Sequence, residues 1–157
     1  MITLRPMTEA ELQEFLEPAI AEYAQGHIDD GQWIKEEALE KSRAEFQGLL
    51  PEGVASPNQY LFTLVNESQQ NVGVLWFAAR EQQGQASAWV YDVRIHEAFR
   101  RHGYGSQAFR AMEQKVRELG LNKIALHVFG NNHAAQEMYK KLGYEVTNVL
   151  MAKTLDA

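Results

Sequence analysis

Hydrophobic residues recur at spacings of three and four in two stretches of the first third of the chain, and this periodicity predicts two amphipathic helices. The first helix follows residues 8–11, a capping box in which a threonine and a glutamate each accept a hydrogen bond from a backbone N–H group. The polar segment 26–31 is expected to separate it from a second helix at 34–50, which Pro51 and Gly53 end. The positions expected to be buried are Leu12, Phe15, Leu16, Ala19, Ile20 and Tyr23 in the first helix, and Leu39, Phe46, Leu49 and Leu50 in the second.

Runs of β-branched and aromatic residues predict a sheet in the rest of the chain. A short strand is expected at 2–4, and strands at 59–65, 72–79 and 86–95 are separated by polar turns short enough for an antiparallel meander. A third amphipathic helix starts near Gly103 and ends at Gly120, and a strand at 124–129 follows it. Residues 86–129 therefore form a βαβ unit with parallel strands. A short helix at 132–142 and a last strand at about 144–153 complete an α/β fold with a mixed sheet, expected to be one domain over residues 1–157.

Composition narrows the class of protein. With 45% hydrophobic and 23% charged residues, the chain matches ordinary globular domains. No apolar run is long enough for a membrane span, and the start of the chain lacks the pattern of a signal peptide. The absence of cysteine suits a reducing compartment, so a cytoplasmic location is expected. The net charge of -6 argues against nucleic-acid binding and mildly favours cationic partners such as amines.

The segment between the strand that ends at Ile95 and the third helix predicts a diphosphate site. The first turn of a helix has backbone N–H groups without intrahelical partners and carries partial positive charge, so it attracts anions. Gly103 and Gly105 allow close approach of the backbone to a ligand. Arg100 can donate two parallel hydrogen bonds to a phosphate. The alternative for these residues is an ordinary turn into a tight helix start.

The spacing of these residues excludes two familiar phosphate loops and fits a third. The dinucleotide fingerprint needs a third glycine, and the P-loop needs Gly-Lys-Ser/Thr; neither is present. The pattern Arg100-x-x-Gly103-x-Gly105 after a strand resembles the acyl-CoA loop of the GNAT superfamily of acyl-CoA-dependent N-acetyltransferases. The later segment from Asn132 to Tyr144 is similar to that family's Asn-x-x-Ala-x-x-Leu-Tyr-x-x-x-Gly-Phe motif, with methionine for leucine and tyrosine for phenylalanine.

The resemblance implies acetyl-CoA as co-substrate and a place for each of its parts. The pantetheine arm would lie between two splayed parallel strands and pair with the backbone of Val93 and Ile95, and the Ile95 N–H would polarise the thioester carbonyl. Asn132 would hydrogen-bond the pantetheine amides, with plain capping of the short helix as its alternative. The residues assigned to the cofactor are Val93, Ile95, Arg100, Arg101, His102, Gly103, Tyr104, Gly105, Ser106, Asn132 and Tyr139.

Two residues are assigned to proton transfer. The family places a tyrosine at the position of Tyr139 near the CoA sulfur, where a protonated phenol could donate to the departing thiolate. Its alternative is a tyrosine packed in the core. Alkylamines with pKa values near ~10.4 must lose a proton before attack. Asp92 is the first candidate base because some polyamine-acetylating relatives carry an acidic residue in a similar setting. Tyr91 and His96 compete with it, and a structural hydrogen bond is the alternative role of Asp92.

The assignment of residues that bind the acceptor amine rests on the resemblance alone. The family's first two helices flank the acceptor pocket, which implies a role in substrate choice for Tyr23, His27, Asp29, Asp30, Trp33 and Tyr91, unless these are ordinary helix surface. The acceptor itself stays open between a small amine, an aminoglycoside-like cation and a protein amine. A non-catalytic acyl-CoA-binding regulator of the same fold is the alternative function. The resemblance to this family also implies a homodimer.

Two other chemistries find no support in the sequence. The five histidines show no spacing typical of a zinc site, so no metal is expected. Ser106 lies outside a G-x-S-x-G elbow, which argues against a serine nucleophile. Donation of a hydrogen bond to a phosphate at the helix start is the expected role of this serine.

Overall fold

A computed structural model describes residues 1–156, apart from the side chain of Gln82. The chain packs as two units, Met1–His127 and Val128–Ala157. The first unit contains a five-stranded sheet with the strand order β1-β2-β3-β4-β5. Its strands are β1 (Thr3–Pro6), β2 (Gln59–Val65), β3 (Asn71–Gln82), β4 (Gln85–Ile95) and β5 (Ile124–Leu126).

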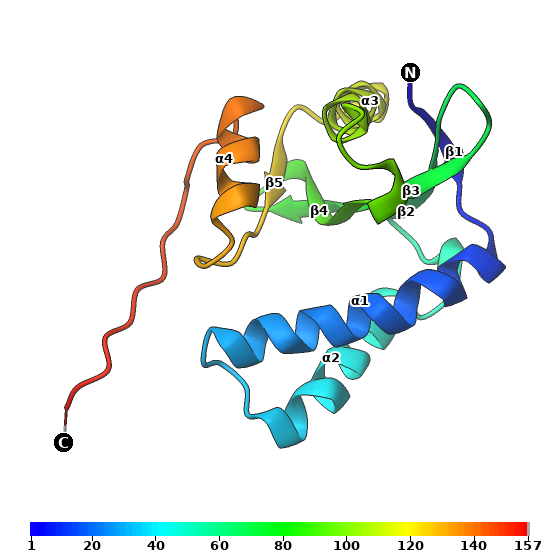
Figure 1. Ribbon diagram of the computed structural model, residues 1–157. Helices are drawn as coiled ribbons and strands as arrows, with labels where there is room; N and C mark the ends of the chain where they lie inside the picture. Colours follow the sequence, from blue (N-terminus) through cyan, green and yellow to red (C-terminus); the bar gives the residue numbers. More distant parts are fainter. Residues whose placement is uncertain (157) are drawn as a thin grey trace. The chain divides into compact units, whose positions relative to one another are not determined.

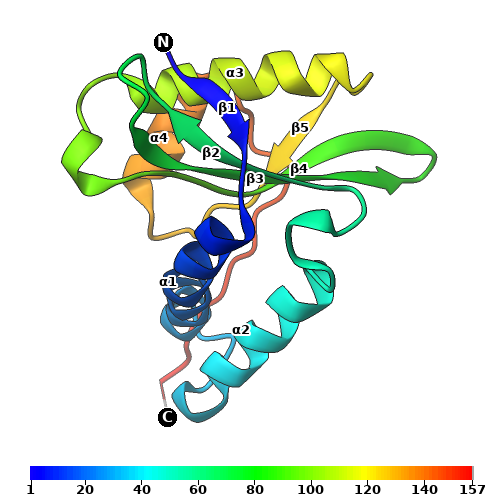
Figure 2. The ribbon, with the colours of Figure 1, turned by 90° about the vertical axis from the view of Figure 1, so that its right-hand side faces the viewer.

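The predicted α/β class with a mixed sheet is confirmed. Strands β1 to β4 pair antiparallel, and β5 pairs parallel to β4 after the crossover helix α3 (Tyr104–Glu118). Helices α1 (Glu9–Asp29) and α2 (Lys35–Leu49) cover one face of the sheet, and α3 covers the other (Figures 1 and 2). Strands β3 and β4 are longer than predicted because their hairpin turns tightly at Gln83 and Gly84, whose φ angles are 53° and 77°.

Helix α1 begins as predicted but ends later. Thr8 accepts a hydrogen bond from the Glu11 N–H, and the Glu11 carboxylate accepts one from the Thr8 N–H, which completes the capping box. The helix then continues to Asp29, so the prediction of a break at 26–31 is wrong. The His27 carbonyl accepts hydrogen bonds from the N–H groups of Gln32 and Trp33, at 2.9 and 3.1 Å, and these bonds hold the last turn to the following loop.

Helix α2 presents a different face to the core than its periodicity predicts. The Leu39 side chain was expected to be buried, but the residue is 51% exposed, whereas Ala38 and Ser42 are buried. The Ser42 hydroxyl donates a 2.7 Å hydrogen bond to the Ile20 carbonyl of α1. The small residues therefore allow α1 and α2 to pack closely, and the larger leucine is turned outward.

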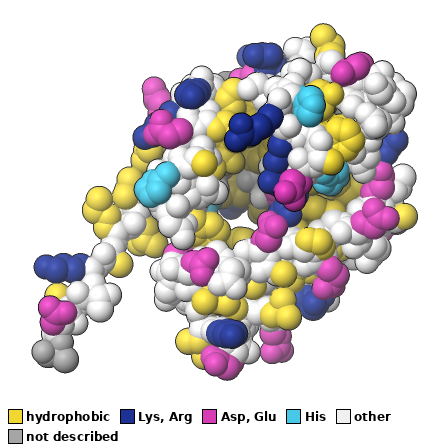
Figure 3. Space-filling model, viewed as in Figure 1, with side chains coloured by type: hydrophobic (Ala, Val, Ile, Leu, Met, Phe, Trp, Pro, Cys, Tyr) yellow, Lys and Arg dark blue, Asp and Glu magenta, His cyan; other side chains and the backbone are white. Residues whose placement is uncertain are grey.

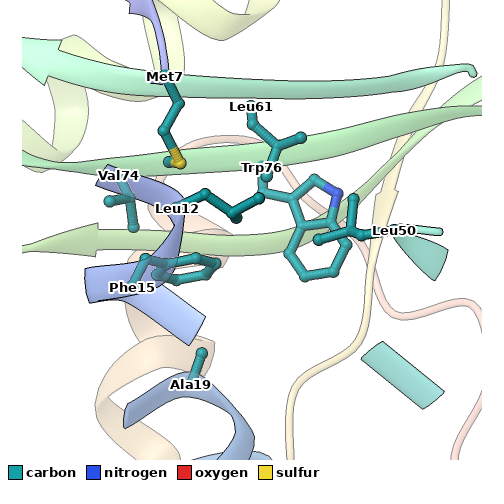
Figure 4. Packing of buried hydrophobic residues seen from close by; sticks show 8 residues of the cluster. All are labelled: Met7, Leu12, Phe15, Ala19, Leu50, Leu61, Val74 and Trp76. Atoms are coloured by element: carbon teal, nitrogen blue, oxygen red, sulfur yellow. The ribbon is translucent and has the colours of Figure 1, made fainter. Parts of the chain in front are cut away.

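The core between the sheet and the first two helices centres on Trp76 of β3 (Figure 4). Its indole N–H donates to the Gln59 side chain at 2.7 Å, so the buried polar atom is satisfied. Phe15 of α1 meets the indole edge-on, with 6.3 Å between ring centroids. The buried cluster comprises Met7, Leu12, Phe15, Ala19, Leu50, Leu61, Val74 and Trp76. It anchors α1 to the middle strands, beside the later half of β4.

The second unit contains α4 (His133–Lys141) and the segment that follows it. Gly143, with φ of 96°, follows the end of the helix, as expected for a glycine C-cap. Residues 144–156 form no strand or helix, so the predicted last strand is wrong for the described chain. A strand requires a backbone partner, and residues 128–156 contain no strand edge with which the segment could pair.

Candidate active site

An extra residue in β4 shifts its pairing with β3. Trp76 of β3 lies opposite Asp92, but its neighbour Phe77 lies opposite Val90. Tyr91 is therefore the additional residue of a bulge, which re-aims the side chains around it. Tyr91 packs on Trp76 with 4.5 Å between ring centroids, and Asp92 contacts an arginine that is bound to α1. Both side chains thus project towards the face that α1 and α2 cover.

Strand β4 has a strand on both sides only in its first half. Its parallel pairing with β5 covers Ala88–Val90, and among the described residues no strand pairs with that edge afterwards. The His96 N–H donates to the Val72 carbonyl of β3 at 2.8 Å. Because successive residues turn their backbone groups to alternate edges, those of Val93 and Ile95 face away from β3. The edge expected to bind an extended ligand is therefore free of a strand.

The loop between β4 and α3 presents backbone N–H groups and an arginine. After a short 3₁₀ turn (Glu97–Phe99), Arg101 and Gly103 adopt φ angles of 66° and 76°. Gly103 is the N-cap of α3, and no side chain caps the helix. The Nε atom of Arg100 donates to the Ile95 carbonyl at 3.0 Å, which leaves the two terminal nitrogens available. Uncapped amides beside a guanidinium can bind a diphosphate.

The space in front of these amides fits such a group. A Cβ atom built on Gly105 would meet no heavy atom within 4 Å, and one on Gly103 would meet only Gln107 Nε2 at 3.9 Å. Ser106 is half-buried in the same first turn. The Gln107 Oε1 atom is buried and lacks a hydrogen-bond partner among the described residues. The open volume and the unsatisfied polar atom are both features of a ligand site.

Two predicted cofactor residues direct their side chains to the protein. The Tyr104 hydroxyl donates to Glu67 at 3.3 Å and accepts from Asn66 at 3.4 Å, and the residue is buried. The His102 ring stacks on Tyr104, and its Nδ1 atom lies 3.0 Å from the Phe99 carbonyl oxygen. For Tyr104, the main-chain N–H is thus the group that remains for a ligand.

Asp92 lies in an ion-pair network with α1. The Arg94 guanidinium contacts Asp92 Oδ2 at 3.2 Å and donates two hydrogen bonds to Glu22 at 2.9 and 2.5 Å. Burial raises the pKa of the Asp92 carboxyl above its usual range, while Arg94 acts in the opposite direction. Figure 3 shows acidic and basic side chains close together on the face in view, next to hydrophobic side chains. A carboxyl group with a raised pKa suits a general base.

His96, the competing base, lies at the end of the same strand. Its Nε2 atom is 3.2 Å from Asn71 Oδ1, so the amide oxygen can accept the imidazole proton. Burial and the positive charges of Arg94 and Arg100 lower the pKa of this imidazole. His96 is therefore neutral at physiological pH, but its ring is engaged by β3.

A chain of aromatic rings connects the end of α1 with the bulge of β4. It brings together four of the predicted acceptor residues, and it adds Trp76 and Phe46, the second of which is among the positions that the sequence predicts to be buried. The centroid distances are 4.2 Å for His27–Trp33, 4.6 Å for Tyr23–His27, 5.9 Å for Tyr23–Phe46, 5.6 Å for Phe46–Trp76 and 4.5 Å for Trp76–Tyr91. Trp76 is buried and the other five rings are half-buried, so they can form an apolar wall beside Asp92.

The acidic acceptor candidates lie outside this chain of rings. Asp29 is exposed and accepts a hydrogen bond from Gln25 at 2.8 Å, and Asp30 accepts one from the Gln32 N–H at 3.1 Å. Glu45 of α2, which sequence analysis did not single out, is nearer to the rings. Burial and this carboxylate raise the pKa of Tyr23 above its ordinary value, so the phenol stays protonated.

The remaining cofactor candidates belong to the second unit. Asn132 Oδ1 accepts a hydrogen bond from the Ala135 N–H at 3.2 Å, so its side chain caps α4. Tyr139 is half-buried, and its ring meets that of Tyr144 edge-on at 5.9 Å. The Tyr144 N–H also donates to the Tyr139 carbonyl at 3.0 Å. The local structure of the second motif is thus a capped helix with an aromatic pair at its end.

Sequence analysis missed Arg94, which contacts Asp92, and Glu22, which binds Arg94. Glu22 and Arg94 are 72 positions apart, and no motif or periodicity connects them. The one available signal was the position of Glu22 next to Tyr23, on the margin of the apolar stripe of α1. Among the described residues, no three His, Cys, Asp or Glu side chains are placed to hold a metal ion.

Comparison with known proteins places the fold in a family. The sequence profile of the Acetyltransferase (GNAT) family matches residues 14–144, and the chain belongs to this family. It is 36% identical over 153 residues to the uncharacterized N-acetyltransferase YdgE of Bacillus subtilis, with 98% of each chain covered. The crystal structure of YycN from Bacillus subtilis, another uncharacterized N-acetyltransferase, matches with a TM-score of 0.93 at 34% identity, over 100% of both chains.

A more distant structural likeness shows the fold alone. An aminoglycoside acetyltransferase from an uncultured soil metagenomic sample, solved with sisomicin, matches with a TM-score of 0.60 at 18% identity, over 99% of this chain and 97% of that one. The predicted GNAT-like fold is therefore confirmed. None of the helices within residues 1–156 has the length and apolarity needed to cross a membrane.

Proposed function

We propose that this protein transfers an acetyl group from acetyl-CoA to a primary amine, by direct attack within a ternary complex. One observation carries the proposal: the strand-free edge of β4 after Val90 is followed, after one short loop, by an uncapped helix N-terminus flanked by Arg100. An extended arm with a diphosphate at one end matches this arrangement in both shape and charge. The relatives named N-acetyltransferases support the same class of reaction.

Each group of the site has a role in this proposal. The first-turn amides of α3 and Arg100 hold the diphosphate, and the backbone of Val93 and Ile95 orients the arm. When bound, acetyl-CoA supplies an activated thioester carbonyl, towards which the Ile95 N–H points its partial positive charge. Asp92 accepts the proton that the ammonium group loses before its nitrogen bonds to the carbonyl carbon, and the second proton of that nitrogen passes to solvent as the amide forms.

Tyr139 completes the proton balance. As the C–S bond breaks, its hydroxyl donates a proton to the sulfur, and solvent then restores the phenol. The products are an N-acetylated amine and free CoA. This assignment rests on the position of Tyr139 in the second family motif, and the acid role is therefore tested by substitution.

The acceptor is expected to be a small amine or a protein amine. The carboxylates of Glu22 and Glu45 lie near the proposed base and the ring chain, and together with the net charge of -6 they favour a cation. Aminoglycosides are one such class, since a protein of similar fold acetylates them according to its name. We infer that residues 1–157 act as one catalytic domain.

Two measurements test the proposal. Calorimetry with CoA tests the site, and we expect saturable binding that excess salt weakens, because phosphate contacts are ionic. A thiol-release assay with acetyl-CoA and a panel of polyamines, aminoglycosides and lysine peptides tests the reaction. Binding without thiol release from any amine would favour a non-catalytic acyl-CoA-binding regulator. Absence of CoA binding would overturn the assignment altogether.

A further inference from the structure

The Arg94 guanidinium is shared between two carboxylates from different elements. It donates two hydrogen bonds to Glu22 of α1, at 2.9 and 2.5 Å, but makes a single contact of 3.2 Å with Asp92 of its own strand. The Arg94 and Asp92 side chains are 24% and 22% exposed, whereas that of Glu22 is 64% exposed. The cation is thus bound more fully by the outer carboxylate than by the inner one.

The way Arg94 distributes its hydrogen bonds between Glu22 and Asp92 affects the basicity of the Asp92 carboxylate. An arginine that pairs with a carboxylate through two parallel hydrogen bonds strongly favours the ionised, proton-free form. A carboxylate held in that way is a weak base. Because Glu22 accepts the two parallel hydrogen bonds of the Arg94 guanidinium, Asp92 accepts only one hydrogen bond from Arg94. The Asp92 carboxylate therefore keeps lone pairs for another donor.

We propose that Glu22 is a positioning residue of the reaction: it holds Arg94 away from full pairing with Asp92, so that the Asp92 carboxylate can accept a proton from the amine. The inference rests on the proposed function, in which Asp92 is the base. Glu22 acts through Arg94 and need not touch either substrate.

The charged surroundings of Asp92 agree with this role. Arg94 favours its ionised form, and Glu22 on α1 opposes ionisation as a like charge. On β3, the residue opposite Asp92 is the uncharged Trp76. Glu45 of α2 acts on Tyr23 and Tyr91, and no α2 carboxylate contributes to the pKa shift of Asp92. Burial, Arg94 and Arg100 lower the pKa of His96, so this residue is neutral at physiological pH.

The same helix offers a matched control. Glu17, five positions before Glu22, also accepts two hydrogen bonds from one arginine, Arg43, at 2.7 and 3.2 Å. That pair joins α1 to α2, whereas the Glu22–Arg94 pair joins α1 to β4. Exposed ion pairs of this kind contribute little to stability, so the isosteric variants Glu22→Gln and Glu17→Gln should both fold.

The first test is the pH dependence of kcat/KM for acetyl-CoA and the best amine of the panel. We expect Glu22→Gln to shift the acidic limb to lower pH by about 0.5–1 unit and to lower the plateau kcat by about threefold, since a less basic carboxylate is a weaker catalyst. The KM for acetyl-CoA should not change. Glu17→Gln should match the wild type in all three quantities. An unshifted acidic limb in Glu22→Gln would overturn the inference and leave the proposed acetyl transfer intact.

The second test does not depend on activity. Carbon-detected NMR titration of the Asp92 carboxyl should show a lower pKa in Glu22→Gln and a higher pKa in Arg94→Gln, with no change in Glu17→Gln. Circular dichroism identifies any variant that fails to fold. Opposite displacements in the two variants would support the ion-pair link even if wild-type protein released no thiol, an outcome that would refute only the transferase. Equal titration in all four proteins would refute the role of Glu22.

Discussion

The Nε atom of Arg100 donates a 3.0 Å hydrogen bond to the main-chain oxygen of Ile95. One side chain therefore ties the loop before α3 to the last residue of β4. The same guanidinium keeps its terminal nitrogens for an anion at the helix start. A change at Arg100 is thus expected to affect two parts of a ligand that spans the loop and the strand.

The substitution Arg100→Lys should weaken CoA binding even though it keeps the positive charge. Lysine has a single nitrogen in place of the three nitrogens of the planar guanidinium. It therefore cannot hydrogen-bond the Ile95 carbonyl and a phosphate on opposite sides at the same time. We expect the Kd to rise about tenfold, as for the loss of one charge-assisted hydrogen bond. Calorimetry measures it. Arg110→Lys, on the exposed part of α3, is the matched control and should bind like the wild type.

At Gly105, ligand affinity and stability should change in opposite directions. The residue lies in the first turn of α3, and a Cβ atom there would meet no protein atom within 4 Å. Gly105→Ala should therefore raise the free energy of unfolding by up to about 1 kcal/mol. If a diphosphate occupies that space, the methyl group should raise the Kd for CoA at least tenfold. Unchanged affinity would show that the ligand lies elsewhere.

Gly103→Ala separates conformational from steric effects. Gly103 has φ of 76°, a region that alanine rarely adopts, whereas its Cβ position is nearly empty. We expect this variant to lose about 1 kcal/mol of stability through backbone strain. Thermal unfolding of the two glycine variants, measured side by side, should show shifts of opposite sign.

Much of the fold could be predicted because local patterns agreed with the tertiary structure. The apolar stripe of α3, the β-branched run before Ile95 and the glycines of the loop each indicate one element without reference to the rest. The capping box at Thr8 is equally local. Such features depend on neighbours in the sequence, and a single chain shows them directly.

Features that depend on distant partners were missed. No glycine or proline marks the bulge at Tyr91, since the extra residue is defined only by its register against Trp76. The outward turn of Leu39 follows from the close contact of α1 and α2 at Ser42. The roles of Glu22 and Arg94 likewise arise from pairing across the fold.

The Asp92 carboxyl should reduce stability at neutral pH. Its pKa is raised in the folded protein by burial, so the folded state holds the proton more tightly than the unfolded chain does. Between the unfolded and the folded pKa, the unfolded state binds fewer protons, and stability therefore falls as pH rises through this window. Below the unfolded value, the carboxyl is neutral in both states and the effect disappears.

Asp92→Asn should consequently raise Tm at pH 7 and lower kcat by at least about a hundredfold if Asp92 is the base. Calorimetric scans at pH 7 and near pH 4 measure the first effect, and the advantage of the variant should shrink at the lower pH. Glu17→Gln provides a carboxylate-to-amide control on α1. A Tm gain of the same size at both pH values would contradict the assigned cause.

Tyr139→Phe tests the proposed acid with little disturbance of packing. The phenylalanine ring can keep the edge-on contact with Tyr144, at 5.9 Å between centroids, while the proton donor is lost. Because thiols have pKa values near ~8.5, a thiolate is a good leaving group, and we expect kcat to fall by about tenfold to a hundredfold. The KM for acetyl-CoA should change less. Tyr144→Phe is the matched control, since the family motif itself has phenylalanine there, and it should keep kcat. Steady-state thiol release measures both variants, and equal kcat in Tyr139→Phe and the wild type would remove Tyr139 from the acid role.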